Sequence, residues 1–239
     1  MWDARELLSL ATGALREQDA ALDAEQSVRG LDACHEVDLH PLLADGFARA
    51  GVAVLREQVY PGPAGARARG FERERCDLVL LPSGGRRLVD PMAERIAADA
   101  LRGTLFEGAP LHPEGDVTPE DAYWLEMKCV GQFEFVADVP VPNRSYASSL
   151  LRAARTDVRK LARDPAILNG AVLVVLFTVA REVAEHDLQV ALHRAVDAGV
   201  PVRSAQWESF AIADRIGNGA CTLCWIEAGR PAEPEQGGE

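Results

Sequence analysis

The sequence predicts an α/β fold in which a mixed central β-sheet is flanked by helices. The chain has 239 residues and is 48 % hydrophobic, which is enough for one sizeable α/β domain. Between residues 34 and 180 the predicted order is helix, three strands, helix and strand. This order combines antiparallel neighbours early with a helical crossover late, so we expect a sheet of mixed direction.

The first two helices and the first two strands are predicted from composition and from the positions of Gly and Pro. Residues 1–30 are rich in Ala, Leu, Glu and Arg, as is typical of a helix that ends near Gly30. A second helical stretch at 33–51 contains Pro41, which either kinks the helix or marks its first turn. Runs of β-branched, aromatic and leucine residues then predict strands, which Pro and Gly end. These strands cover residues 52–60 and 73–81, with a loop at 61–70.

The second half of the chain is predicted to alternate strands and helices. Residues 137–143, ADVPVPN, hold two prolines and are expected to break the strand pattern. The continuous apolar run at 171–180, AVLVVLFTVA, is typical of a strand that is covered on both faces. The other predicted elements are helices at 91–106, 145–163 and 183–198, a polar connection at 107–121, and strands at 122–130, 200–207 and 220–227.

This order predicts one principal domain with additions. Residues 1–30 are expected to be an N-terminal helical extension, and residues 31–227 a single α/β domain whose core is 34–180. The segment at about 82–121 is predicted to be an insertion between the second and third strands. The polar tail at 228–239, rich in Gly, Pro and Glu, is expected to be disordered.

The charge of the chain limits how it can meet nucleic acid. A formal net charge of −12 argues against a protein that coats nucleic acid by bulk electrostatic attraction. Residues 144–163 are a local exception, because they hold six basic residues and one acidic residue, Asp157.

Residue usage also predicts where the protein works. The chain has no run of 18 apolar residues, and its start, MWDARELLSL, carries charges where a signal peptide needs an apolar core. Five cysteines, an odd number, favour a reducing compartment over a disulfide framework. We therefore expect a cytoplasmic protein without a membrane segment.

The third predicted strand contains WLEMK, with a lysine in a chain where 23 of 25 basic residues are arginine. Side chains alternate along a strand, so Glu126 and Lys128 should share one face as a charge pair, opposite an apolar face. Buried charges persist when they are paired or bound to a metal. The pKa of an ammonium falls on desolvation, so a lysine can position or deprotonate water, whereas a guanidinium stays protonated.

Two further carboxylates lie at informative places in the element order. Asp77 is in the second predicted strand, next to the strand of Glu126, and Glu36 is in or just before the second helix. Mg²⁺ prefers oxygen ligands, commonly one or two carboxylates with water and substrate phosphate. Asp77 and Glu126 on adjacent strands could supply such ligands.

These residues and their order resemble the restriction-endonuclease-like superfamily, known by its PD-(D/E)XK signature. Asp77 and Glu126-Met127-Lys128 match the signature, with Cys76 at the position of its proline. The resemblance implies an αβββαβ core with an insertion and C-terminal additions. It also implies a Mg²⁺ ion, for which Mn²⁺ substitutes, bound by Asp77, Glu126 and Glu36, with Lys128 helping to activate the attacking water.

The function that this resemblance implies is Mg²⁺-dependent hydrolysis of DNA phosphodiester bonds, in defence, repair or mobile-element processing. RNA is the less favoured substrate. Basic side chains at helical spacing could contact a phosphate backbone, and a glutamine of the same parity as Glu126 could touch substrate. The candidate nucleic-acid contacts are Arg152, Arg155, Arg159, Lys160 and Gln132.

Several alternatives stay open. Glu126 and Lys128 could form an exposed salt bridge, which contributes little stability. Asp77 could pair with Arg75, the helix at 145–163 could be a solvated face, and Glu57 is a reserve carboxylate. The chain as a whole could be a non-catalytic subunit with a nuclease fold that binds or regulates through a protein partner. A homodimer is also compatible with the sequence.

The histidines of HEVDLH, residues 35–40, invite comparison with a helical zinc site. His35 and His40 are five residues apart, whereas the helical zinc motif places its histidines four apart on one face. The sequence therefore predicts no zinc site of that type here.

Overall fold

The computed structural model describes residues 2–62, 74–82, 85, 87–108, 111 and 115–230. Most of the loop predicted at 61–70 lies outside the described residues. The same holds for residues 231–239 of the predicted disordered tail, while Ala228 still belongs to the last strand.

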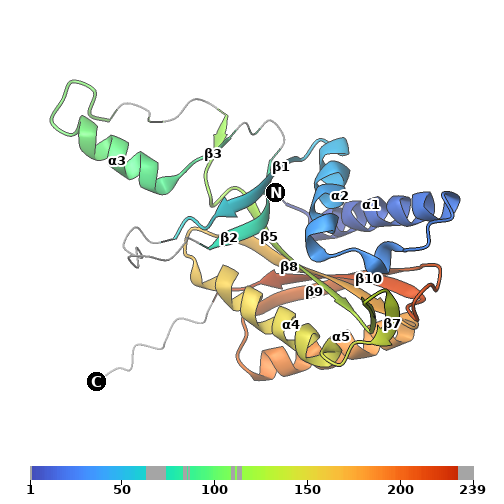
Figure 1. Ribbon diagram of the computed structural model, residues 1–239. Helices are drawn as coiled ribbons and strands as arrows, with labels where there is room; N and C mark the ends of the chain where they lie inside the picture. Colours follow the sequence, from blue (N-terminus) through green and yellow to red (C-terminus); the bar gives the residue numbers. More distant parts are fainter. Residues whose placement is uncertain are drawn as a thin grey trace, which may run out of the picture.

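A six-stranded mixed sheet forms the centre of the protein (Figure 1). In sheet order the strands are β1 (Ala53–Val59), β2 (Arg75–Leu81), β5 (Tyr123–Gly131), β8 (Asn169–Thr178), β10 (Ala220–Ala228) and β9 (Val202–Ala211). The neighbouring strands β5 and β8 are parallel, and the other four neighbouring pairs are antiparallel. All six predicted strands form, and the predicted fold class, a mixed sheet flanked by helices, is confirmed.

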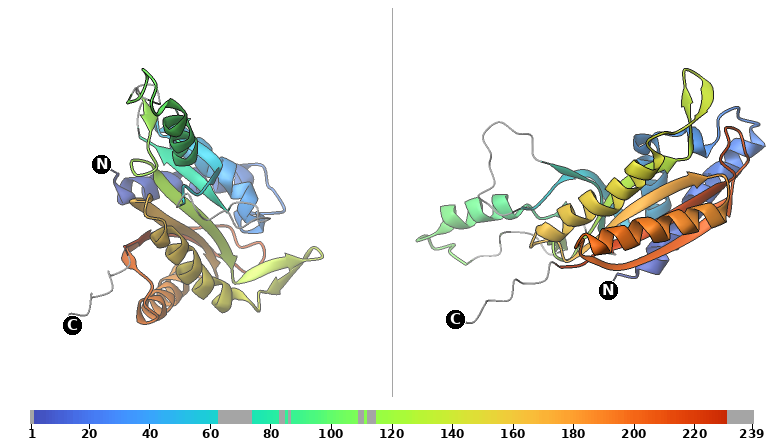
Figure 2. Two further views of the ribbon diagram at one scale, coloured as in Figure 1. Left: turned by 90° about the vertical axis from the view of Figure 1, so that its left-hand side faces the viewer. Right: turned by 90° about the horizontal axis from the view of Figure 1, so that it is seen from below.

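Two pairs of helices cover the two faces of the sheet (Figures 1 and 2). On one face lie α1 (Ala4–Ala24) and α2 (Glu36–Arg49), and on the other lie α4 (Tyr146–Arg163) and α5 (Arg181–Asp197). Apolar residues recur every three or four positions along α4, which places them on its buried side. They are Leu150, Ala153, Ala154, Val158 and Leu161.

The strand β8 explains the continuous apolar run in the sequence. Alternate residues Val172 and Val174 pack in the core under α4 and α5, while Leu173 and Val175 pack in the core under α1 and α2. Each such side chain contributes roughly 1.5–3 kcal/mol on full burial. Both faces of β8 are therefore apolar, and the strand holds the two layers of helices together.

The segment between β2 and β5 leaves the sheet. It contains β3 (Arg87–Leu88), α3 (Pro91–Leu101) and β4 (Asp116–Val117), and β3 pairs with β4 in parallel. The helix α3 extends away from the body and has no buried residue (Figure 1). The division of the chain into core, insertion and additions stays a prediction.

The expectation that residues 137–143 break the strand pattern is wrong. They contribute to a hairpin of β6 (Phe133–Val136) and β7 (Val139–Pro142), which projects from the body (Figure 2). The turn residues Ala137 and Asp138 have φ values of 48° and 62°, which suit a two-residue hairpin turn. Prolines are tolerated in this strand because it belongs to a two-stranded ribbon with a free edge.

Two helix boundaries also differ from the predictions. The first helix ends at Ala24 rather than near Gly30, and a short 3₁₀ helix at Leu31–Ala33 follows. Pro41 lies inside α2, at its sixth residue, and not in its first turn. None of the helices in the described ranges is long and apolar enough to cross a lipid bilayer.

Candidate metal centre

The candidate site lies where β2 and β5 separate. The two strands pair from Leu80 opposite Tyr123 to Leu78 opposite Leu125, and the ladder ends there. One residue further, the Asp77 carboxylate accepts a hydrogen bond from the Met127 N–H, at 2.7 Å. This side chain satisfies a backbone donor that has lost its strand partner, and it is thereby fixed at the opening.

Glu36 reaches the same opening from the first turn of α2. Its Oε1 accepts a hydrogen bond from Lys128 Nζ at 3.1 Å, and its Oε2 accepts one from the Cys129 N–H at 3.2 Å. A carboxylate at a helix N-terminus is favoured by the helix dipole. A capping interaction, in which the His35 N–H donates to Asp38 at 3.0 Å, defines where the helix begins.

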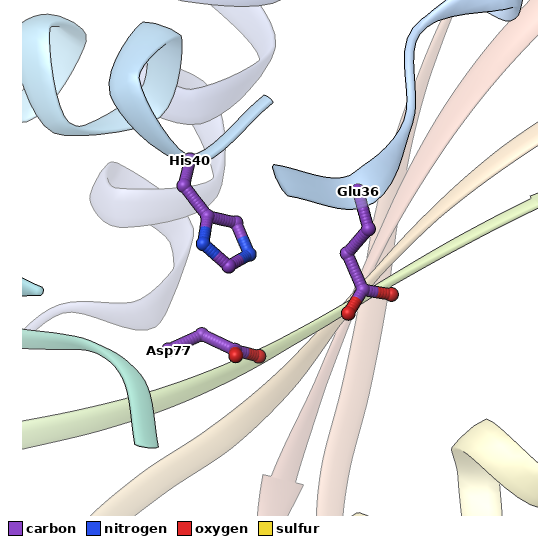
Figure 3. Close-up of side chains that lie close together, drawn as sticks. All are labelled: Glu36, His40 and Asp77. Carbon is purple, nitrogen blue, oxygen red and sulfur yellow. The ribbon is translucent and has the colours of Figure 1, made fainter. Parts of the chain in front are cut away.

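Glu36 and Asp77 meet the imidazole of His40. One ligand atom from each of the three side chains lies within 4.8 Å of the other two, and Figure 3 shows the side chains pointing toward one another. His40 follows Glu36 by four residues, so one helical turn places both on the same face of α2. Two carboxylates and an imidazole form a set of donors that suits a divalent cation.

Sequence reasoning missed His40. The histidines of HEVDLH were tested only as a pair with each other, and the informative spacing is from Glu36 to His40, four residues on one helix. A search for carboxylate and histidine at that spacing, at the start of a helix that precedes three strands, could have found it.

Glu126 is the most enclosed carboxylate of the region, with 3 % of its surface exposed. Its Oε1 accepts hydrogen bonds from Lys160 Nζ at 2.8 Å and from the Tyr60 hydroxyl at 2.5 Å. Burial raises the pKa of the Glu126 carboxyl, and the two hydrogen bonds only partly oppose this. Glu126 does not belong to the group formed by Glu36, His40 and Asp77.

The shared strand face predicted that Lys128 pairs with Glu126, but the two side chains do not pair in the structure. Its Nζ lies 3.1 Å from Glu36 Oε1, 2.6 Å from the Met127 carbonyl oxygen, and 4.0 Å from a carboxylate oxygen of both Asp77 and Asp157. The positions of the two lysines explain this difference. Lys160 on α4 reaches the buried carboxylate, and Lys128 turns toward the start of α2. Both lysines of the chain therefore lie at this site.

The pKa of Lys128 moves in the direction opposite to the prediction. Burial acts to lower this pKa, but the carboxylates of Glu36, Asp77 and Asp157 raise it, and they prevail. Lys128 is therefore an ammonium that can donate hydrogen bonds to water or to a phosphate oxygen.

Asp157 is an additional acidic residue of the site. It comes from α4, and its side chain is 14 % exposed. The pKa of its carboxyl is raised by burial, and the nearby Lys128 ammonium only partly opposes this effect. The sequence places Asp157 and Lys160 one turn apart on this helix but does not predict Asp157 as a metal ligand.

Two of the predicted nucleic-acid contacts are engaged inside the protein. Arg155 Nη2 donates to the carbonyl oxygen of Arg194 at 2.8 Å, and Arg159 Nη2 donates to that of Ala198 at 2.5 Å. The Ala198 oxygen lies at the C-terminal end of α5, where carbonyls lack partners within the helix, whereas the Arg194 oxygen also accepts a hydrogen bond from the Ala198 N–H at 3.3 Å. Both arginines thus bind the end of α5.

The other predicted contacts come from α4 and from the residue that follows β5. Lys160 bonds to Glu126, and Arg152 is exposed on α4. Gln132 Oε1 accepts a hydrogen bond from the Val179 N–H at 3.0 Å, which ties the end of β5 to the end of β8. Nucleic-acid binding by these residues stays a prediction.

Comparison of the chain with family models, with curated proteins and with solved structures finds no match. The fold and the site are therefore the basis for proposing a function. The fold is a mixed α/β sheet between two helical layers, and the site is a group of acidic side chains, one histidine and two lysines where two strands separate.

Proposed function

We propose that this protein is a divalent-cation-dependent nuclease that hydrolyses phosphodiester bonds of DNA. The observation that carries the proposal is the meeting of Glu36, Asp77 and Lys128 where β2 and β5 separate. The order α2, β1, β2, β5, α4, β8 also has the αβββαβ sequence of the restriction-endonuclease-like core.

The carboxylates of Glu36 and Asp77 fit a hard divalent cation, Mg²⁺ or Mn²⁺, because they offer oxygens within 4.8 Å of each other. A cation bound there would polarise a phosphate and lower the pKa of its bound water. The Lys128 ammonium, 4.0 Å from Asp77 Oδ2, is placed to donate a hydrogen bond to the attacking water or to a phosphate oxygen.

Glu126 and Lys160 support this arrangement from the α4 side. Their ion pair, 2.8 Å long, compensates a buried carboxylate next to the opening. We infer that Glu126 contributes to cation binding when it is released from Lys160, as the resemblance to the superfamily implies.

A cleavage assay tests the proposal. Purified protein is incubated with supercoiled plasmid and Mg²⁺ or Mn²⁺, beside Asp77→Asn and Lys128→Met. We expect each variant to lose at least about 100-fold in rate, because each removes a group that would act at the reacting phosphate. The matched control is Asp45→Asn, since Asp45 is exposed on α2 away from the opening. Equal cleavage by wild type and all variants would exclude this site.

A second candidate is a non-catalytic subunit that keeps the fold and acts through a protein partner, including a second copy of the chain. The engagement of Arg155 and Arg159 with α5 favours it, because these arginines are then less free to meet a phosphate backbone. Calorimetry separates the two candidates. If wild type binds neither Mg²⁺ nor Mn²⁺, and Glu126→Gln gives the same result, the non-catalytic role is supported.

The proposed setting is the cytoplasm. All five cysteines are free thiols, the state that a reducing compartment maintains.

A further inference from the structure

We propose that His40 binds the cation through its Nε2 atom, with Glu57 positioning the ring, and that this nitrogen ligand makes the site select Mn²⁺ over Mg²⁺. This inference rests on the proposed cation site of Glu36 and Asp77. It adds a ligand, a positioning residue and a metal preference.

The burial of His40 is the first observation. Only 2 % of its surface is exposed, and its Nε2 has no hydrogen-bond partner among the described residues. A buried polar nitrogen without a partner costs roughly 1–3 kcal/mol. A buried imidazole with an unpaired nitrogen beside two carboxylates is suited to bind a cation through that nitrogen.

The direction of the ring is the second observation. Figure 3 shows the His40 ring extending from α2 into the space between Glu36 and Asp77, with one ring nitrogen toward their carboxylates. Glu36 is fixed by the Cys129 N–H and Asp77 by the Met127 N–H, so both carboxylates are held in place before any cation arrives. Ligands held in this way lose little freedom on binding.

Glu57 supplies the third observation. Its Oε1 lies 3.9 Å from His40 Nδ1, within ion-pair range although longer than a hydrogen bond. A carboxylate there attracts the proton to Nδ1 and leaves the lone pair of Nε2 free. Histidines that bind metals commonly have such a partner on the other ring nitrogen.

The backbone of Glu57 is itself unusual. Its φ is 53°, the left-handed region, in the middle of β1. It lies opposite Asp77, between the pairs Arg56 with Leu78 and Gln58 with Cys76. A residue other than glycine in this conformation is strained, and such strain often occurs at functional sites. The backbone conformation of β1 thus places Glu57 beside His40.

The metal preference follows from the donor set. Mg²⁺ is a hard cation that favours oxygen ligands and retains several waters. Imidazole nitrogen suits first-row transition metals, and carboxylates accept Mn²⁺ as readily as Mg²⁺. One nitrogen with two carboxylates therefore favours Mn²⁺.

Calorimetry on the full chain measures the preference. We expect wild type to bind Mn²⁺ at least about 10-fold more tightly than Mg²⁺. In His40→Gln the Mn²⁺ affinity should fall by about 10- to 100-fold and the Mg²⁺ affinity should change little. His186→Gln is the matched control, since His186 is exposed on α5, and it should retain the wild-type ratio.

Pulsed electron paramagnetic resonance on bound Mn²⁺ gives a direct signature. Wild type should show the coupling of a directly bound ¹⁴N nucleus, and His40→Gln should lose it. If Mn²⁺ binds to wild type and this coupling is absent, the inference is overturned. The proposed nuclease function survives that result if the protein still cuts plasmid. If neither cation binds to wild type, the cation site and the inference both fail.

Glu57→Gln tests the positioning role without disturbing the core, because the Glu57 side chain is 52 % exposed. It should retain the ¹⁴N coupling but lower the ratio of Mn²⁺ to Mg²⁺ affinity, by about 10-fold. A purely structural role would leave that ratio unchanged, and an unchanged ratio would remove Glu57 from the proposal.

Discussion

Glu126 is a carboxylate held within the protein by the Lys160 ammonium and the Tyr60 hydroxyl. Its side chain is 4 % exposed and that of Lys160 is 23 % exposed. When one partner of a buried ion pair is removed, the charge that remains loses its compensation, which is a strongly destabilising change.

Lys160→Met is therefore expected to lower the free energy of unfolding by about 3 kcal/mol near neutral pH. The pKa of Glu126 is already raised by burial, and loss of Lys160 raises it further. A raised carboxyl pKa in the folded state means that stability is present at low pH and is lost as pH rises above about 4.3, the usual value for glutamate.

Urea unfolding at pH 4.5 and pH 8 measures this effect. The difference between wild type and Lys160→Met should be larger at pH 8. Adding Glu126→Gln to the variant should recover most of the loss, because no buried charge remains. The matched control is Arg163→Met, exposed on the same helix, which should change stability by less than about 0.5 kcal/mol. A difference that is equal at both pH values would show that Glu126 is not the group involved.

Glu57 offers a second test at the residue scale, since its φ of 53° is unfavourable for a side chain with a Cβ atom. Glu57→Gly is expected to raise the free energy of unfolding by about 0.5 kcal/mol, the relief of strain less the added entropy of the unfolded chain. Glu57→Ala keeps the strain and should give no gain. Thermal or urea unfolding measures both variants, and equal stabilities would indicate an unstrained backbone.

At this scale the sequence predicted positions better than partners. Lys128 lies near Glu36 and Asp77, two of the three predicted ligands, because strand neighbours and the start of a helix follow from hydrophobic patterns. The partner of Glu126 could not be predicted, since Lys160 lies on a later helix and reaches the carboxylate only through tertiary packing. The predicted direction of the Lys128 pKa shift was wrong for the same reason, because the shift depends on three carboxylates from different elements.

Among the elements, α4 and α5 are joined by arginines as well as by apolar contacts. Arg159→Ala removes the hydrogen bond to the Ala198 carbonyl at the end of α5. It is expected to lower the free energy of unfolding by about 1 kcal/mol. Arg152→Ala, exposed on the same helix, should leave stability unchanged. If Arg159→Ala instead weakened DNA binding and left stability unchanged, the phosphate-binding role of Arg159 would be favoured.

Element boundaries were predictable where apolar periodicity is strong. The predicted helix at 145–163 differs from the structure by one residue at its start, and the predicted strand at 122–130 differs by one residue at each end. The hairpin of β6 and β7 was missed because prolines such as Pro140 and Pro142 usually end a strand, although a strand with a free edge accepts proline. Its turn lacks the Asn-Gly or Asp-Gly pair that usually marks such hairpins.

On the scale of the whole molecule, the sequence predicted the mixed sheet but not the order of its last strands. The chain passes from β8 through α5 to β9 at the edge and returns as β10 between them. The placement of β10 buries Trp225, whose Nε1 donates to the Tyr123 hydroxyl at 2.9 Å. Contacts between strands so far apart in sequence depend on packing and not on local pattern.

The distribution of charge limits how the protein can bind DNA. The chain carries a net charge of −12, both lysines pair with carboxylates, and Arg155 and Arg159 bind the end of α5. In the basic stretch at 144–163, three of the six basic residues thus bond within the protein and are less free to displace the counterions of DNA. Each phosphate contact contributes a slope of about −0.9 to the dependence of log affinity on log salt concentration.

We therefore expect a slope no steeper than about −3 for binding to a duplex, corresponding to about three phosphate contacts. Fluorescence anisotropy with a short phosphorothioate duplex, at constant Mn²⁺ and increasing NaCl, measures it. Arg152→Ala should make the slope shallower by about one, because Arg152 is exposed on the basic helix. A wild-type slope of about −6 or steeper would require an extended basic surface and would contradict this account of how an acidic chain meets DNA.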